Sequence, residues 1–321
     1  MRIRLLVIVG PTACGKTRLG VDVAHALGSE IVSADSRQVY RGLDIGSGKD
    51  RELYDSVSPP VPVHLIDIAD PAGIYSIFHY QRDCYELLRA KAERDPHRNG
   101  LPLVMVGGSG LFVEAVLRGY RIPDVPEDLD LRRELMARPH HELLGELSRL
   151  DPELFERTDH STRKRVARAL EIALHARDHE VRYSPPPPVR IDAEVFGVEV
   201  PRVELLRRID ERLEGRLRGG MIEEVEGLLR AGVTPDRMAQ LGLEYREITA
   251  FLTGAKGKTE MLEDLRLGIR RLAKRQRTWF RGMPGRGIPV RWIGPGDVAV
   301  ALEHTAVTGG RPPRFPPRPP E

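Results

Sequence analysis

Eight consecutive residues near the N-terminus have the types and spacing needed to bind a chain of phosphates. They are Gly10, Pro11, Thr12, Ala13, Cys14, Gly15, Lys16 and Thr17. The glycines allow a nest of inward-pointing backbone amides, and a helix that begins here adds positive potential. Lys16 supplies a cation, and the hydroxyl of Thr17 can hold Mg²⁺. The motif predicts a P-loop for a di- or triphosphate, without saying which compound binds or whether a phosphoryl group is transferred.

A second set of polar residues follows residues 30–34, a segment that we expect to form a strand. They are Asp35, Ser36, Arg37 and Gln38. In a doubly wound sheet the carboxyl ends of the strands face the ligand crevice, which places Asp35 beside the phosphate site. A carboxylate there can act as a general base, and capping a turn or helix is its alternative role. The polar, Gly-rich residues 40–49 suit a loop across the mouth of the site.

The apolar run at residues 103–106 is typical of a buried parallel strand, and it ends in a second Gly-rich turn at residues 107–110. ATPases of the motor or switch kind usually have a Mg²⁺-ligating Asp after such a strand. Here two glycines and Ser109 form a small nest instead. Asp67, which follows another strand-like segment, could be that Asp, so the difference alone does not exclude an ATPase.

Two groups of cations are candidates for binding nucleic acid. A solvated helix face explains the first group as well as a phosphate-binding patch does; it comprises Arg163, Lys164, Arg165 and Arg168. The second is a stripe on a helix expected over residues 264–281. Its members are Arg266, Arg270, Lys274, Arg277 and Arg281, with Arg271 and Arg275 beside them. Like charges at this spacing repel unless acids or phosphates compensate them, and for the stripe we favour nucleic acid.

Length and composition define the kind of chain that must position these groups. The 321 residues exceed the size of most single cores, and the net charge of +3 is too small to diagnose nucleic-acid binding by itself. Two cysteines permit neither a disulfide framework nor a zinc site. The apolar run at residues 5–9 is too short for a signal peptide or a membrane span. We expect a cytoplasmic protein without membrane contact and take it to be a monomer.

Strand-like segments at residues 3–9, 30–34, 63–67, 103–106 and 195–198 alternate with helical segments. This order predicts an α/β fold: a P-loop NTPase-like core with a central parallel sheet flanked by helices. Charged, proline-punctuated segments before the last strand predict a small all-helical insertion. We place the first part of the core at 1–118, the insertion at 119–194, the second part with the basic helix at 195–305, and a disordered Pro/Arg-rich tail at 306–321.

Five motifs in this order resemble those of bacterial tRNA dimethylallyltransferases. They are the P-loop, Ala-Asp-Ser-Arg-Gln-Val-Tyr (34–40), Asp-Ile-Gly (44–46), Val-Gly-Gly-Ser-Gly-Leu (106–111) and Ala-Lys-Arg-Gln-Arg-Thr-Trp-Phe (273–280). The resemblance covers nearly everything before the tail. It implies that a dimethylallyl group passes from dimethylallyl diphosphate, with Mg²⁺, to N6 of the adenosine just 3′ of the anticodon in tRNAs that read codons beginning with U. It also implies that the P-loop holds the diphosphate leaving group and not ATP.

The resemblance implies roles for individual residues. Asp35 would be the general base, while Lys16, Thr17 and Arg212 would act on the diphosphate with the P-loop. The residues expected to bind tRNA are Asp35, Ser36, Arg37, Gln38, Ser109, Arg163, Lys164, Arg165, Arg168, Arg270, Lys274 and Gln276. The insertion would clamp the anticodon stem-loop, and the target base would have to be extruded to reach the loop.

The chain departs from the family pattern at four places. Cys14 replaces Ser or Gly, Ser109 replaces Thr, Phe112 replaces Tyr, and residues 241–246 carry an extra residue, which leaves tRNA contacts there open. Two other functions remain alternatives. A P-loop small-molecule kinase would grip ATP and use Asp35 to activate a hydroxyl, and a nucleotide-gated RNA-binding module would catalyse nothing. The basic helix argues against the kinase, and Asp35 argues against the module.

Overall fold

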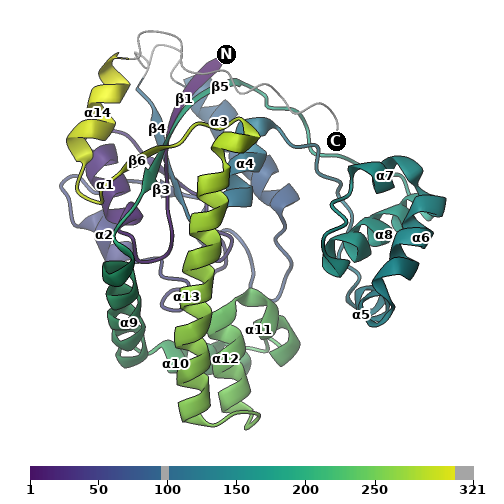
Figure 1. Cartoon of the computed structure of the whole chain (residues 1–321). Helices are drawn as coiled ribbons and strands as arrows, with labels where there is room; N and C mark the ends of the chain where they lie inside the picture. The colour runs from purple at the N-terminus through teal and green to yellow at the C-terminus, as the bar shows by residue number, and fades with distance from the viewer. Residues whose placement is uncertain (95–100, 308–321) are drawn as a thin grey trace. The chain divides into compact units, whose positions relative to one another are not determined.

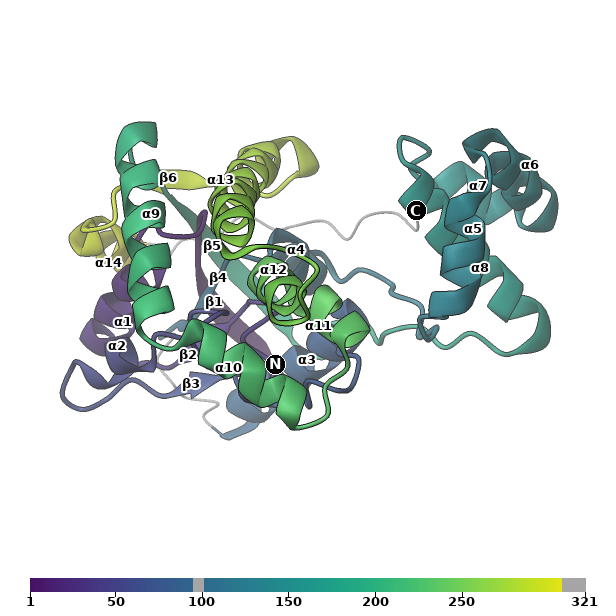
Figure 2. The same cartoon turned by 90° about the horizontal axis from the view of Figure 1, so that it is seen from below.

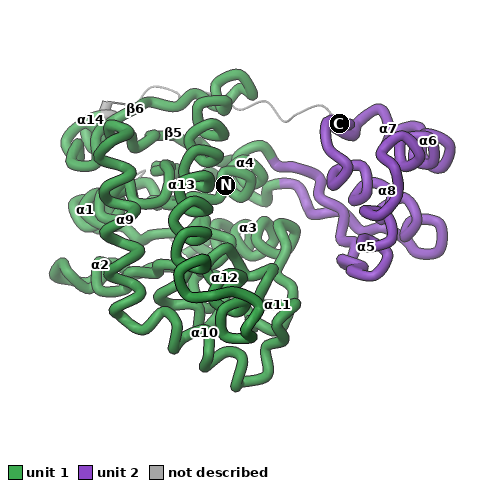
Figure 3. The backbone as a smooth tube through the Cα atoms, turned by 60° about the horizontal axis from the view of Figure 1, so that its bottom comes forward, with its two compact units in different colours: residues 1–118, 187–316 green, residues 119–186, 317–321 purple. Residues whose placement is uncertain are grey.

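The computed structural model describes residues 1–94 and 101–307 and divides into two compact units (Figures 1 and 3). Within the described residues, unit 1 comprises residues 1–118 and 187–307, and unit 2 comprises residues 119–186. Unit 1 is thus made of two chain segments with unit 2 inserted between them. The sequence-based boundary at 194 is too late, because the core strand that follows the insertion begins at Arg190.

Unit 1 is built on a parallel sheet. Within the described residues its six strands are β1 (Arg2–Val9), β2 (Ile31–Ser33), β3 (Val63–His64), β4 (Leu103–Gly107), β5 (Arg190–Val198) and β6 (Arg291–Ile293). They pair in the order β3-β2-β4-β1-β5-β6, and every pair is parallel. At the centre, Leu5 of β1 pairs with Leu103 of β4 and with Ala193 of β5. The predicted α/β class with a central parallel sheet is confirmed.

Two strands differ from the sequence-based expectation. The first half of β5 is absent from the predicted strands, although charged residues alternate with apolar ones there as in a half-buried strand. One of these charged residues, Asp192, is nevertheless buried, because its carboxylate pairs with Arg2 of β1 and lies 3.2 Å from Arg190 Nε. The second strand, β6, has three residues, too few for any periodic pattern.

Helices cover both faces of the sheet because successive residues of β1 point to opposite sides. Leu6 and Ile8 belong to one core cluster, and Leu5, Val7 and Val9 belong to the other. The first cluster includes residues of α1 (Lys16–Ala26), α9 (Arg202–Arg218), α10 (Met221–Arg230) and α12 (Leu243–Leu252), and the second includes residues of α3 (Ile77–Arg94) and α4 (Gly110–Arg118). Figure 2 shows α1 and α9 on one side of the sheet and α3 and α4 on the other.

The long basic helix, α13, spans Lys258–Gly282 and therefore starts earlier than the expected residue 264. Its apolar face continues towards the N-terminus through Met261, which is buried together with Leu265 and Ile269. The helix packs against α12 and α9. The other short elements of unit 1 are α2 (Arg51–Asp55), α11 (Pro235–Leu241), the 3-10 helix η1 (Pro284–Arg286) and α14 (Val298–Val307).

Unit 2 consists of four helices in its described part: α5 (Leu129–Ala137), α6 (His140–Leu150), α7 (Pro152–Arg157) and α8 (Arg163–Asp178). They enclose a separate core that includes Leu143, Leu147 and Leu170. Side chains of Asp128, Asp151 and Thr162 cap three of the helices by accepting from free backbone amides, as these residue types commonly do.

The last element of the described chain is the helix α14. The helix α14 runs to Val307, so the predicted tail at 306–321 begins inside a helix, and its remainder, 308–321, lies outside the described residues. In the part of the chain that the structure describes, none of the helices combines the length and apolar character required to cross a membrane.

Candidate active site

The P-loop connects β1 to α1 in the expected strand–loop–helix context. Ala13 and Gly15 adopt left-handed backbone conformations, with φ of 65° and 94°, and α1 begins at Lys16. A Cβ on Gly10 would lie 2.6 Å from the sulfur of Cys14, so this glycine is required for the loop to close. Cys14 is fully buried beneath the loop, and burial raises the pKa of its thiol. The residue that departs from the family pattern is therefore a packing residue and does not face the ligand site.

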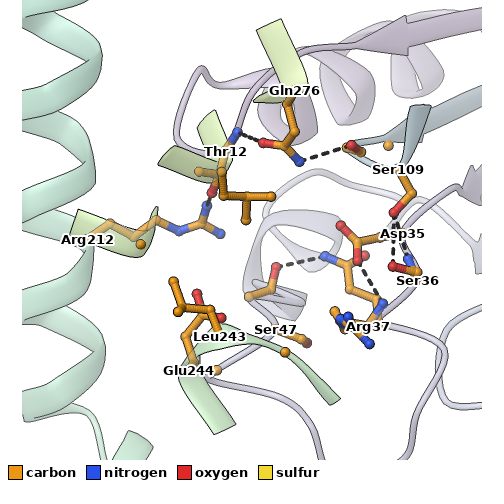
Figure 4. A pocket seen from close by; sticks show the side chains of 18 of the residues that line it. Thr12, Asp35, Ser36, Arg37, Ser47, Ser109, Arg212, Leu243, Glu244 and Gln276 are labelled. Atoms are coloured by element: carbon orange, nitrogen blue, oxygen red, sulfur yellow. Dashed lines mark hydrogen bonds between the residues drawn. The ribbon is translucent and has the colours of Figure 1, made fainter. Parts of the chain in front are cut away.

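A cavity of about 560 Å³ opens beside this loop (Figure 4). Ten of the 21 predicted site residues line it: Thr12, Lys16, Thr17, Asp35, Ser36, Arg37, Gln38, Ser109, Arg212 and Gln276. They come from the carboxyl ends of β1, β2 and β4 and from the helices α9 and α13. The cavity walls are completed by residues 46–48, by α12 and by further residues of α13. The structure thus brings together groups that are up to 264 residues apart in the chain.

Asp35 combines its two expected roles. Its Oδ1 accepts a hydrogen bond from the backbone amide of Arg37 at 2.9 Å, which fixes the turn after β2. A Cβ on Gly108 would lie 3.7 Å from Asp35 Oδ2 and 3.6 Å from Lys16 Nζ. The same Cβ would lie 2.7 Å from Gln276 Nε2, so glycine is required where this side chain approaches the second carboxylate oxygen and the P-loop lysine. One oxygen is used for positioning and the other is available for chemistry.

Gln276 ties the two Gly-rich turns together. Its side-chain oxygen accepts from the backbone amide of Thr12 at 2.8 Å, and its amide nitrogen donates to the carbonyl of Gly108 at 2.9 Å. The amide of Gln276 is thus occupied at both ends by backbone groups (Figure 4). Gln276 therefore holds the two turns together, and its expected contact with tRNA stays a prediction.

The segment after β2 is fixed by a similar set of contacts. The backbone amide of Ser36 donates a hydrogen bond to Ser109 Oγ at 3.0 Å. Arg37 donates to the carbonyl of Gln240 at 2.8 Å. Gln38 is buried and donates to the carbonyl of Gly48 at 2.9 Å. All three residues line the cavity, and Gln38 also holds the loop at residues 40–49 in place.

The loop at residues 40–49 crosses the cavity as expected and is held by Glu224 of α10. The carboxylate of Glu224 accepts from three successive backbone amides, those of residues 44, 45 and 46, at 2.9, 2.6 and 3.0 Å. It also accepts from the hydroxyl of Tyr245 at 2.9 Å. A Cβ on Gly46 would lie 2.7 Å from the ring of Tyr245, so glycine is required there. Sequence reasoning missed Glu224, because no local motif marks it.

Arg212 and a second arginine, Arg216, enter the cavity from α9. Arg212 Nη1 donates to Thr12 Oγ1 at 3.4 Å, and its other terminal nitrogen pairs with Asp50. Arg216 follows one turn later; burial and the charge of Arg212 lower its pKa to about 10. It was missed by the sequence analysis, although the i, i+4 spacing of the two arginines was a signal for a shared face.

The basic stripe of α13 is largely compensated within unit 1. Four of its five members lie near acids: Arg266 and Arg270 face Asp210 at 3.7 and 2.5 Å, and Arg277 and Arg281 both lie 2.6 Å from Glu199. These acids provide the partners that the sequence analysis assigned to phosphates. The fifth member, Lys274, is exposed.

The two arginines beside the stripe line the cavity, in contrast to two members of the stripe itself. Arg271 and Arg275 line the cavity, whereas Arg270 and Lys274 do not. One residue along a helix is a rotation of about 100°, and sequence periodicity does not say which face meets α9. The expected contacts of Arg270 and Lys274 with tRNA stay a prediction.

The cations expected in the insertion are mostly engaged within unit 2. Arg163 and Arg168 donate to backbone carbonyls at 2.9 and 2.8 Å, and Arg165 pairs with Asp159. Lys164 is exposed. A structural use of three of these side chains therefore exists, and their contact with tRNA stays a prediction.

Two acidic residues are relevant to whether the protein itself supplies carboxylate ligands for a metal ion. Glu244 lies in the segment with the extra residue and lines the cavity, and burial raises its pKa. Asp67, considered above as a metal ligand, instead pairs with Lys49 and Arg51 and is not among the lining residues. The described residues contain no group of three or more His, Cys, Asp or Glu side chains arranged to hold a metal ion. A hydroxyl such as that of Thr17 beside bound phosphates suits Mg²⁺, which usually keeps waters and takes few protein ligands.

Comparisons with known proteins agree with this geometry. A family model described as IPP transferase matches residues 38–283. The chain is 46% identical over 300 residues to tRNA dimethylallyltransferase 1 of Syntrophus aciditrophicus (strain SB), with 94% of this chain and 96% of the relative covered. It is 42% identical over 289 residues to tRNA dimethylallyltransferase 1 of Porphyromonas gingivalis, covering 90% and 93%. The crystal structure of the full-length tRNA isopentenylpyrophosphate transferase from Bacillus halodurans superposes with a TM-score of 0.65 at 32% identity, with 96% of each chain covered. This protein therefore belongs to the IPP transferase family, as its motifs indicate.

Proposed function

We propose that this protein transfers a dimethylallyl group from dimethylallyl diphosphate to N6 of the adenosine just 3′ of the anticodon, in tRNAs that read codons beginning with U. Its curated relatives are named tRNA dimethylallyltransferases. The observation that carries the proposal is the placement of Asp35 in the same cavity as the P-loop residues Lys16 and Thr17. The family shares this activity, and the residues of the cavity supply its chemical requirements.

The acceptor needs a base because the exocyclic amine of adenine is a poor nucleophile. As the bond from N6 to the allylic carbon forms, the bond from that carbon to the diphosphate oxygen breaks. The free oxygen of Asp35 takes the proton that N6 loses. Asn or Gln could not accept this proton, so a carboxylate is needed at the position.

The leaving group needs positive charge because diphosphate departs with an additional negative charge. Lys16, Arg212 and the backbone amides of the P-loop provide it from fixed positions, so little reorganisation accompanies the reaction. Mg²⁺ bound to the diphosphate would add charge neutralisation, and the hydroxyl of Thr17 would be its protein ligand.

The tRNA must reach the cavity from the side opposite the P-loop and present an extruded base. Ser36, Arg37 and Ser109 line the cavity and would contact the tRNA, and Arg271 and Arg275 add positive charge to its wall. Unit 2, with its exposed basic residues, would hold the anticodon stem-loop. We also propose that the protein is a monomer and acts in the cytoplasm.

One assay tests the proposal against a P-loop kinase. Unmodified tRNA is incubated with the protein and either dimethylallyl diphosphate labelled in its prenyl carbons or ATP labelled in its γ-phosphate. We expect prenyl label in the RNA, located after nuclease digestion in the nucleoside 3′ of the anticodon. Label from ATP in any acceptor, with none from the prenyl donor, would support the kinase instead.

A further inference from the structure

Arg216 lines the cavity, but the proposed reaction gives it no role so far. It lies on α9 one helical turn after Arg212, so that the two guanidinium groups point the same way. Its side chain is only 15% exposed, and it lines the cavity together with Thr12 and Lys16. A buried arginine in a cavity wall needs acceptors for its N–H groups and a compensating negative charge.

The two guanidinium groups converge on the backbone of the loop at Gly48. An ideal Cβ on Gly48 would lie 1.5 Å from Arg216 Nη2 and 2.5 Å from Arg212 Nη2. Glycine is required there because the space that any side chain would need is filled by the two arginines. Asp50 pairs directly with Arg212, whereas its Oδ1 lies 3.7 Å from Arg216 Nη2. One carboxylate thus stands close to two cations.

The hydrogen-bonding capacity of Arg216 is not used within the described residues. Its Nη2 is buried without a hydrogen-bond partner there, and its Nη1 donates only a long bond of 3.5 Å to the carbonyl of Gly46. A buried, charged donor without an acceptor costs free energy. The lowered pKa of Arg216 has the same origin, since burial and the neighbouring Arg212 both disfavour its charged form.

The charge of the whole cavity points to the partner. Seven of its lining residues are Lys or Arg and two are Asp or Glu. Arg216 lines this cavity together with Thr12 and Lys16 of the P-loop and with Arg212, which itself donates to Thr12. A planar guanidinium offers two parallel N–H groups, which match adjacent oxygens of a phosphate group.

We infer that Arg216 binds the diphosphate of the prenyl donor together with Arg212. The inference rests on the proposed function and adds a second guanidinium to the groups that hold the leaving group. In this arrangement the diphosphate accepts the hydrogen bonds that Arg216 Nη2 otherwise lacks. It also adds negative charge beside two arginines that have only the carboxylate of Asp50 between them.

Affinity for inorganic diphosphate, measured by titration calorimetry with Mg²⁺, tests the inference without requiring turnover. We expect Arg216→Gln to weaken binding at least tenfold, in line with the loss of a charge-assisted hydrogen bond. Arg216→Lys keeps the charge but not the fork, and its affinity should fall between the parent and Arg216→Gln. The matched control is Arg207→Gln on the same helix, whose side chain is 56% exposed and pairs with Glu204 and Glu211. The control should bind diphosphate as the parent does.

Affinity for the anticodon stem-loop separates this role from an RNA contact. Arg216→Gln should leave stem-loop binding unchanged within a few-fold. A folded Arg216→Gln protein with parental diphosphate affinity would overturn the inference, and so would one that loses stem-loop affinity alone. Neither result would touch the proposed function, which stands or falls with prenyl transfer by the unaltered protein.

A measurement on the unaltered protein covers the case in which the Gln variant does not fold. The Nε–Hε resonance of Arg216, assigned by comparison with Arg216→Lys, should shift when inorganic diphosphate and Mg²⁺ are added. Arg207 serves as the internal reference, and its resonance should stay in place. A resonance of Arg216 that does not move at saturating diphosphate would rule the contact out.

Discussion

At the scale of single residues, the site depends on side chains that have one atom for structure and another for chemistry. Asp35 shows this division, since one carboxylate oxygen accepts from the backbone amide of Arg37 and the other lies near Gly108. Arg212 divides its nitrogens between Asp50 and the P-loop hydroxyl of Thr12. Fixed donors and acceptors of this kind keep the reactive atoms in place before the substrates arrive.

The first prediction follows from the two oxygens of Asp35. Asp35→Asn retains an oxygen that accepts from the amide of Arg37, so the turn and the affinity for tRNA should be preserved within a few-fold. It cannot accept the proton from N6, and turnover should fall by roughly 10²-fold or more. Single-turnover kinetics with saturating tRNA provide the measurement. A near-parental single-turnover rate would show that another group is the base.

Site residues that belong to a short motif could be predicted from the sequence, whereas residues that reach the site from distant helices could not. The P-loop and Asp35 are recognisable because each sits at the end of one strand, within a few residues of the next element. Arg216 and Glu224 act on residues 40–49 from a distance of more than 160 residues along the chain. Their contacts depend on where α9 and α10 pack, which no short motif records.

At the scale of elements, α13 shows how packing decides the use of a charged helix. Its periodicity predicted the helix and its apolar face, which the burial of Leu265 and Ile269 confirms. It did not predict which cations are free, because Asp210 of α9 compensates Arg270 at 2.5 Å. Arg271 and Arg275 of the same helix instead line the cavity.

The second prediction separates these two faces of α13. Changing Arg271 and Arg275 to Gln should weaken tRNA binding and reduce the slope of log affinity against log salt by about one per lost phosphate contact. The matched control is Arg270→Gln, which should leave the slope unchanged, because Arg270 is directed at Asp210. Filter binding from low to moderate salt gives both slopes. Equal slopes for all three proteins would assign Arg271 and Arg275 to other partners.

The third prediction concerns the loop at residues 40–49. The carboxylate of Glu224 occupies a nest of three backbone amides, which resembles an anion held by the loop. Glu224→Ala removes the acceptor for all three, so amide hydrogen exchange at residues 44–46 should accelerate.

Because Gly48 of this loop meets Arg212 and Arg216, the KM for dimethylallyl diphosphate should also rise about tenfold or more. Glu226→Gln on the exposed face of the same helix is the control and should change neither quantity. A rise in exchange without any change in KM would mean that the loop does not shape the donor site.

At the scale of the whole molecule, a helical unit is inserted into a sheet domain without interrupting the sheet. β4 and α4 precede the insertion and β5 follows it, and β1 pairs with both strands. A deletion that extended to residue 194, the boundary read from the sequence, would remove half of β5 and its register with β1, in which Asp192 pairs opposite Arg4. A deletion that tests the role of unit 2 must therefore end before β5 begins at Arg190.

The cut can be made where the entering and leaving chains of unit 2 meet. The backbone amide of Ser184 donates to the carbonyl of Ile122 at 2.8 Å, and Ser184 Oγ accepts from the amide of Ile122 at 2.9 Å. The two backbones are thus adjacent, and a short Gly/Ser linker from Ile122 to Ser184 can replace residues 123–183. Unit 1 keeps its own core clusters and every strand of its sheet in this variant.

The fourth prediction is that this shortened protein separates the two substrates. If unit 1 holds the donor, it should bind dimethylallyl diphosphate with Mg²⁺ as the full chain does. If unit 2 holds the anticodon stem-loop, affinity for the stem-loop should fall at least tenfold, which corresponds to a loss of about 1.4 kcal/mol. Calorimetry with each ligand, on protein whose folding is checked by circular dichroism, measures both. Undiminished stem-loop affinity would refute the clamp, and loss of both affinities in a folded variant would mean that unit 2 also shapes the donor site.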